Sequence, residues 1–95
     1  MADPDFRPNP YIVSRFFERL QRARARGGQV NKTRLQMATS LKWPDFARYV
    51  ERLTELGLLS LEEESGETLV RATEKGWEVY YSLLRVLAEL TRTPI

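Results

Sequence analysis

The chain has 95 residues and a mass of 11.1 kDa, and 42% of its residues are hydrophobic while 29% are charged. This length fits one domain, and the composition is that of a globular protein rather than a disordered or low-complexity chain. Cysteine and histidine are both absent, which excludes disulfide frameworks, thiolate metal sites and the commonest general base. No P-loop, dinucleotide-binding or nucleophile-elbow motif is present, so we expect neither an enzyme nor a bound cofactor or metal.

Residues 1–8 contain two prolines and no hydrophobic periodicity, so we expect them to form a flexible N-terminal arm. Neither this segment nor any other resembles a signal peptide or a membrane span. These features favour a cytoplasmic protein without a membrane partner.

The first helix is predicted to begin at Asn9 and Pro10, because asparagine is a favoured N-cap and proline suits the first helical position. It should continue to about Ala25 and end at residues 27–28, which are two glycines. Residues 29–30 are then long enough for an edge strand at most. Apolar residues and arginines recur on two different faces of this helix: Ile12, Val13, Phe16, Phe17, Leu20 and Ala23 on the first, and Arg15, Arg19, Arg22 and Arg26 on the second.

The second predicted helix covers residues 32–40, with Asn31 as its N-cap. Leu35 and either Met37 or Ala38 are expected to face inward. Because the helix has few apolar residues, we expect it to be stable only when it packs against its neighbours.

Residues 41–43 form the predicted turn before a third helix, which opens at Pro44 and runs to Leu56. Gly57 is expected to follow the helix in a left-handed conformation. The apolar and polar faces are both continuous along this helix: we expect Phe46, Tyr49, Val50, Leu53 and Leu56 to be buried, and Asp45, Arg48, Arg52 and Glu55 to lie on the opposite face.

After Gly57 the hydrophobic spacing changes from that of a helix to that of strands. Residues 58–62 and residues 68–72 are the predicted strands, and Ser65 and Gly66 between them are typical of a tight turn. These segments predict a β-hairpin before the last helix.

The last predicted helix covers residues 74–92, with Thr73 as its cap and Pro94 preventing its continuation. It is apolar on more than one face, whereas a helix that covers a small domain needs a single stripe. We therefore predict that residues 9–73 form the domain and that the last helix joins two copies; the alternative is that one subunit uses both faces. The expected interface residues are Tyr80, Leu83, Leu84, Val86, Leu87 and Leu90.

The predicted order is three helices, a hairpin and a long last helix, which is a mainly α winged helix-turn-helix with a small β-hairpin (α+β). Residues 32–38, 41–46 and 49–59 resemble archaeal winged-helix regulators, and residues 71–76 resemble the L-T-x-K-G segment before their final helix. The resemblance is greatest to a small archaeal chromatin-associated family. It implies a last helix that pairs two subunits through an antiparallel coiled coil.

Charge is unevenly distributed along the chain, although the formal net charge is +2. Residues 15–34 contain seven cations and one anion, a local charge of +6, whereas residues 58–74 contain five anions and one cation, a local charge of −4. A polyanion is attracted to the first segment and repelled by the second. Double-stranded DNA is therefore the expected partner.

In a winged helix-turn-helix the third helix enters the major groove, and the helix before it crosses the phosphate backbone. Arg48 and Arg52 are suited to reach base edges or phosphates. If Glu51 or Glu55 pairs with these arginines, the face is neutral instead. Trp43 either contacts DNA or packs back as a hydrophobic staple. The predicted DNA-binding residues are Lys32, Thr33, Arg34, Lys42, Trp43, Asp45, Arg48 and Arg52.

The predicted wing carries four glutamates between residues 62 and 67, and each of these carboxylates repels phosphate. We expect the wing to point away from DNA, while the first three helices and the arm residues Phe6 and Arg7 make the contacts. These features predict a homodimeric DNA-binding protein of the nucleoid, either a transcription regulator or a chromatin-like protein, without a small-molecule effector. The alternative is a protein-interaction module that docks through its acidic wing or its third helix.

Overall fold

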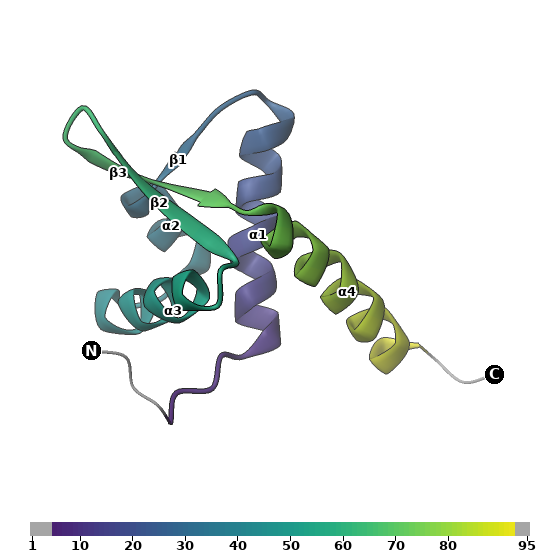
Figure 1. Cartoon of the computed structure of the whole chain (residues 1–95). Coiled ribbons are helices and arrows are strands. Elements are labelled where there is room, and N and C mark those ends of the chain that lie inside the picture. Colours follow the sequence, from purple (N-terminus) through teal and green to yellow (C-terminus); the bar gives the residue numbers. More distant parts are fainter. Residues whose placement is uncertain (1–4, 93–95) are drawn as a thin grey trace.

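A computed structural model describes residues 5–92 of the chain. Its elements follow the predicted order, and the short strand after the first helix is present (Figure 1). The winged-helix architecture with a long C-terminal helix is thus confirmed. The elements are α1 (Pro10–Ala25), β1 (Val30–Asn31), α2 (Lys32–Thr39), α3 (Trp43–Glu55), β2 (Leu59–Glu64), β3 (Glu67–Ala72) and α4 (Glu74–Thr91).

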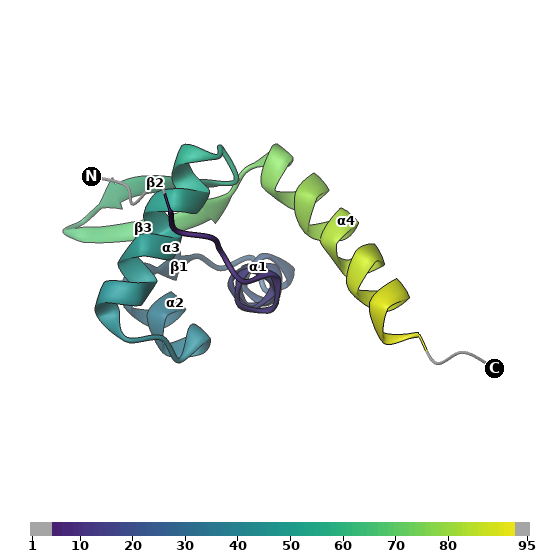
Figure 2. The same cartoon turned by 90° about the horizontal axis from the view of Figure 1, so that it is seen from below.

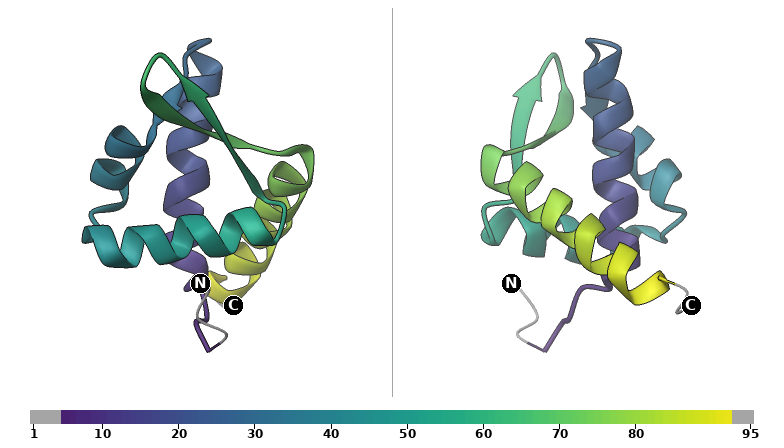
Figure 3. Two further views of the ribbon diagram at one scale, coloured as in Figure 1. Left: turned by 60° about the vertical axis from the view of Figure 1, so that its left-hand side comes forward. Right: turned by 90° about the vertical axis from the view of Figure 1, so that its right-hand side faces the viewer.

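Helix α1 lies at the centre of the molecule. Viewed nearly along its axis, it separates α2, α3 and the hairpin on one side from α4 on the other (Figure 2). Helix α4 crosses α1 near its own beginning and then projects away from the other elements (Figures 1 and 3). Among the helices of residues 5–92, none combines the length and the apolar character that crossing a membrane requires.

The sheet has three antiparallel strands in the order β1-β3-β2. The hairpin pairs Leu59 with Ala72 at one end and Glu64 with Glu67 at the other. Ser65 and Gly66 both have positive φ angles, of 51° and 81°, as a two-residue hairpin turn requires. Strand β1 pairs with the outer edge of β3, so the expected short edge strand is confirmed.

Aromatic rings form the centre of the core. Phe16 and Phe17 of α1 are both fully buried and point to opposite sides of the molecule. Phe16 stacks on Phe46 and Tyr49 of α3, with ring centroids 5.5 and 5.7 Å apart, whereas Phe17 stacks on Tyr80 of α4 at 5.4 Å. One helix therefore anchors both α3 and α4.

Three helices begin at the predicted polar caps. The side chain of Asn9 accepts a hydrogen bond from the Tyr11 amide, Asn31 accepts one from the Arg34 amide and Thr73 accepts one from the Gly76 amide. Each cap satisfies an amide that the helix itself leaves without a partner. The caps therefore explain why the starts of α1, α2 and α4 could be read from the sequence.

Two of the expected inward-facing positions are wrong. In α2 neither Met37 nor Ala38 is buried; Thr39 is buried instead, four residues after Leu35 and on the same face. Burial of this hydroxyl is tolerated because it donates a hydrogen bond to the Gln36 carbonyl oxygen at 2.8 Å. Leu56, expected in the buried stripe of α3, is exposed because it caps the end of the helix.

The junction between α3, β2 and α4 explains the segment at residues 73–76. Lys75 donates from Nζ to the Leu56 carbonyl oxygen at 2.7 Å, and the Thr73 hydroxyl donates to the carbonyl oxygen of Gly57. Gly76 is buried against Leu58. The first turn of α4 is therefore bonded to the end of α3, which sets the direction in which α4 leaves the domain.

Candidate nucleic-acid interface

The outer face of α3 carries arginines that are exposed and paired with carboxylates. Arg48 Nη2 lies 3.0 Å from Asp45 Oδ1, and Arg52 Nη1 lies 3.6 Å from Glu55 Oε2. The side chains of Arg48 and Arg52 keep 49% and 34% of their surface exposed. The Arg48 guanidinium is therefore accessible, whereas Arg52 is partly buried and its Nε atom has no hydrogen-bond partner among residues 5–92. The paired arrangement considered from the sequence is present for Arg52 with Glu55.

These ion pairs do not prevent the arginines from binding an external anion. An ion pair between exposed side chains contributes only about 0–1 kcal/mol, because water screens it and both side chains lose conformational entropy. A phosphate or a base edge offers a charged or bidentate acceptor of at least equal strength. The outer face of α3 can therefore exchange its internal carboxylates for an external anion.

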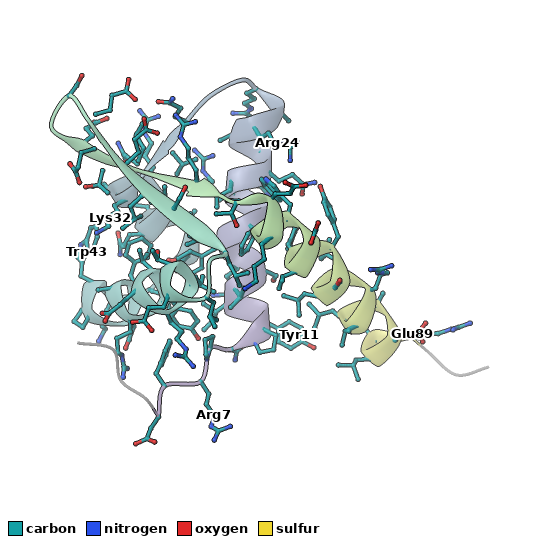
Figure 4. The ribbon with its side chains drawn as sticks, in the orientation of Figure 1. Arg7, Tyr11, Arg24, Lys32, Trp43 and Glu89 are labelled. Carbon is teal, nitrogen blue, oxygen red and sulfur yellow. The ribbon has the colours of Figure 1, made fainter. Side chains whose placement is uncertain are left out.

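An N-terminal residue, Phe6, packs against the same helix. Its ring meets Tyr49 edge-on with centroids 4.9 Å apart, and the guanidinium carbon of Arg48 lies 5.2 Å from the Phe6 centroid. The amide of Asn9 donates to the Tyr49 hydroxyl at 2.9 Å. Arg7 instead points away from the domain (Figure 4). Phe6, expected to contact DNA as part of a flexible arm, thus packs on the protein itself. Residues 1–4 of the expected arm lie outside the described residues.

A groove separates α2, the start of α3 and the turn of the hairpin. It has a volume of about 290 Å³ and is lined by Lys32 and Thr33, by Trp43 and by residues 66–68. Lys32 and Trp43 lie close to each other at this edge of the molecule (Figure 4). Trp43 meets the Phe46 ring edge-on at 5.4 Å but leaves half of its surface exposed. It therefore makes a staple-like contact and still presents an aromatic surface to the groove.

The wing lies beside this groove, so its acidic turn is close to Lys32 and Thr33, two of the predicted DNA-binding residues. The physical reason is the strand register: Asn31, immediately before α2, pairs with Leu69 of β3. The hairpin turn must therefore extend past the beginning of α2. Glu67 lines the groove, and its Oε1 atom accepts a hydrogen bond from the side-chain Nδ2 of Asn31 at 3.4 Å.

The predicted DNA-binding residues fall into separate groups. One group, formed by Lys32, Thr33 and Trp43, lines the groove. Arg34 and Lys42 are exposed, and neither forms an ion pair within residues 5–92. Arg34 and Lys42 thus form a second group, and a third group, Asp45, Arg48 and Arg52, lies on the outer face of α3.

The arginines of α1 occupy a different surface. A shallow groove of about 130 Å³ between α1 and α2 is lined by Arg15, Arg19 and Arg22 together with Glu18. Arg22 pairs with Glu18 at 3.1 Å, which neutralises part of this surface. Arg24 lies elsewhere, over the ring of Trp77.

Helix α4 leaves much of its apolar surface uncovered. Leu84, Val86 and Leu90 are exposed, and Leu90 keeps 72% of its surface. Leu83 is partly buried against the core of its own chain. Tyr80 is only 4% exposed, so its burial against Phe17 removes it from the surface that a second copy could contact. The remaining apolar residues lie beyond this point on the projecting part of the helix.

Comparison with known proteins agrees with this architecture. Residues 17–91 match the model of a family described as winged helix-turn-helix. Comparison with curated proteins found no match.

Three solved structures share the fold. The DNA-binding protein Sso10a-2 from Sulfolobus solfataricus is 21% identical with a TM-score of 0.59, and the match covers 93% of this chain and 100% of that one. SSV1 F-93 is 17% identical with a TM-score of 0.63, over 95% and 96% of the two chains. The PcaV transcriptional regulator from Streptomyces coelicolor is 17% identical with a TM-score of 0.57, over 98% of this chain and 68% of that one. At these identities the comparisons show a common fold.

Proposed function

Because the chain belongs to the winged helix-turn-helix family, we propose that it binds double-stranded DNA, with α3 in the major groove and α2 across the phosphate backbone. The observation that carries the proposal is the accessible outer face of α3, where Arg48 is half exposed and held by a weak ion pair. Two proteins of similar fold, a DNA-binding protein and a transcriptional regulator, support this reading. The biological role is that of a transcription regulator or a chromatin-like protein.

The neighbouring helix supplies sequence-independent attraction. Lys32 and Arg34 are the charged residues of α2, which therefore carries a charge of +2 without an acidic residue. Lys42 follows at the turn before α3. Cations in such positions hold phosphates and fix the register of the protein on the duplex. In this proposal the arginines of α3 read base edges, while the lysines and Arg34 hold the backbone.

The proposal is tested by fluorescence anisotropy with a labelled duplex over a series of salt concentrations. We expect Arg48→Ala to weaken binding by about 1–3 kcal/mol if Arg48 contacts a base. Lys32→Ala should weaken binding to all duplexes and reduce the slope of log K against log salt by about 1. Arg85→Ala is the matched control, because Arg85 is an exposed arginine on α4 and its removal changes the net charge equally.

The control separates a specific contact from a general loss of charge. If Arg85→Ala weakens binding as much as Arg48→Ala does, α3 is not the contacting helix. If no duplex binds at low salt, the DNA-binding proposal is wrong. In that case the alternative function, a protein-interaction module, is favoured by the carboxylates that neutralise α3 and by Glu67 in the neighbouring groove.

We also propose that the protein acts as a homodimer through α4. Leu84, Val86 and Leu90 are apolar and exposed, and a helix with an uncovered apolar face is stabilised when a second helix covers it. A two-fold axis at this helix would hold two copies of α3 in one particle and let them contact two half-sites of a duplex. In this arrangement residues 9–73 form the DNA-binding domain and residues 74–92 the dimerisation helix.

A further inference from the structure

A third cavity, open to solvent like the two grooves above, lies at the C-terminal end of α1, where that helix meets the sheet and the first turns of α4. Its volume is about 370 Å³. The apolar part of its lining includes Leu20 and Ala23 of α1, Val70 and Ala72 of β3, and Trp77 of α4. Binding sites for small molecules have volumes of about 300–1,000 Å³ and combine apolar walls with a few polar groups. The volume lies in this range, and polar groups of Arg24, Gln29 and Arg71 stand beside the apolar residues.

Two arginines supply the charge of this cavity. Arg24 and Arg71 line it, and no carboxylate is among its described lining residues. Arg71 Nε lies 3.0 Å from Glu62 Oε2, which neutralises that cation. Arg24 differs, because within residues 5–92 no carboxylate lies within 4 Å of its guanidinium group. Among residues 5–92 the cavity therefore holds one positive charge without a counter-ion.

Arg24 is exposed, and its guanidinium group contacts an aromatic ring. Its guanidinium carbon lies 5.0 Å from the centroid of Trp77, a cation–π contact. A guanidinium that is already oriented loses less conformational entropy when it binds a ligand. Its planar array of donors matches both oxygens of a carboxylate.

We propose that this cavity binds a small aromatic carboxylate, with the ring on the apolar lining and the carboxylate on Arg24. The volume is at the lower end of the range for small-molecule sites, which accommodates one fused ring system with a carboxyl group. Arg24 lies on a different side of the molecule from Lys32 and Trp43 (Figure 4). The ligand site is therefore separate from the proposed DNA surface and does not depend on it.

The probe for this site is naphthalene-2-carboxylate, and naphthalene-2-carboxamide is its uncharged counterpart of the same shape. Isothermal titration calorimetry on the full chain should show that the carboxylate binds about tenfold more tightly than the amide, because a hydrogen bond to a charged group is the stronger one. Arg24→Gln should bring the two affinities within about twofold of each other. Arg26→Gln is the matched control, because Arg26 is exposed near the same helix end and does not line the cavity.

A second variant tests the position of the ring. Ala72→Leu adds three carbon atoms inside the cavity and should therefore reduce the affinity for both probes. If Ala72→Leu does not fold, the comparison of Arg24→Gln with Arg26→Gln still tests the proposal. The Trp77 indole N–H signal should shift on titration, as followed by NMR of the Trp43→Phe variant. Equal affinities for carboxylate and amide, equal effects of Arg24→Gln and Arg26→Gln, or no binding at all would each overturn the proposal.

Discussion

Gly76 is the residue whose identity the packing determines most strictly. A Cβ atom at this position would lie 2.1 Å from the Leu58 carbonyl oxygen and 3.1 Å from the ring of Phe17. The close approach lets the first turn of α4 rest directly on the chain that leaves α3. Glycine is required here by contact rather than by backbone conformation, because Gly76 has an ordinary helical φ angle.

Gly76→Ala tests which of two opposing effects is larger. In an open helix, alanine is more stable than glycine by about 1 kcal/mol. Here we expect the overlap with Leu58 to dominate and to lower the free energy of unfolding by about 2 kcal/mol or more. Urea denaturation measures the change, with Ser82→Ala on the exposed side of α4 as the control. A variant as stable as the parent would show that the close approach is absent in solution.

Tyr80 makes stability depend on pH in the alkaline range. Burial raises the pKa of Tyr80 above its usual value of 10.0, and Glu18 and Tyr81 add to the increase. The folded chain therefore holds the phenolic proton more tightly than the unfolded chain does. This contribution to stability is complete below about pH 10 and is lost as the pH rises through the raised pKa. The free energy of unfolding should fall less steeply above pH 10 in Tyr80→Phe, as urea titrations at several pH values would measure; parallel curves would contradict this.

At the scale of elements, α4 has two different halves. Its first turns are bonded to α3 and contact α1, whereas the two most exposed apolar residues, Val86 and Leu90, lie in the second half. A surface of this kind on a small domain is usually an interface. The proposed dimer would cover it without any change in the core of either copy.

Leu90→Asp separates the dimer from the fold, because Leu90 keeps 72% of its surface exposed in one chain. We expect the variant to remain folded and to dissociate, since a carboxylate in an apolar interface is costly to desolvate. Light scattering should report a mass of one chain instead of two. Ser82→Asp adds the same charge on the polar side of α4 and should leave the mass unchanged. An unaltered mass for Leu90→Asp would exclude this half of α4 from the interface.

At the scale of the whole molecule, charge is arranged so that attraction and repulsion meet at one groove. Lys32 attracts a polyanion, and Glu67 in the same groove repels it. The remaining carboxylates of the wing are partly engaged within the hairpin: Glu62 pairs with Arg71, and Glu63 accepts a hydrogen bond from Thr68. The wing therefore limits the affinity of the proposed DNA surface instead of increasing it.

Glu67→Gln tests this interpretation. The amide oxygen can still accept the hydrogen bond from Asn31, so the change removes the charge and keeps the contact. We expect the affinity for duplex DNA to increase by about twofold or more at low salt, because a unit charge about 10 Å from a phosphate costs about 0.4 kcal/mol in water. The increase should disappear at high salt. Glu78→Gln on α4 is the control, and an equal gain there would indicate only the change in net charge.

The sequence by itself determined the order of the elements, the starts of three helices and the hairpin turn, because those signals are local. Asn9, Asn31 and Thr73 cap helices through amides two or three residues away, and the turn at residues 65–66 needs only its own backbone conformation. The same local signals predicted a hairpin and a long last helix. Together they were sufficient for the winged-helix fold.

Tertiary structure alone decided which residues of different elements lie next to each other. Pairing of Asn31 with Leu69 brings the acidic turn beside Lys32, and the cavity around Arg24 is assembled from segments that are far apart in the sequence. Thr39 is buried in place of Met37 because it lies on the face of α2 that carries Leu35 and packs against the core. Such contacts depend on the directions in which whole elements pack, and no short stretch of sequence contains that information.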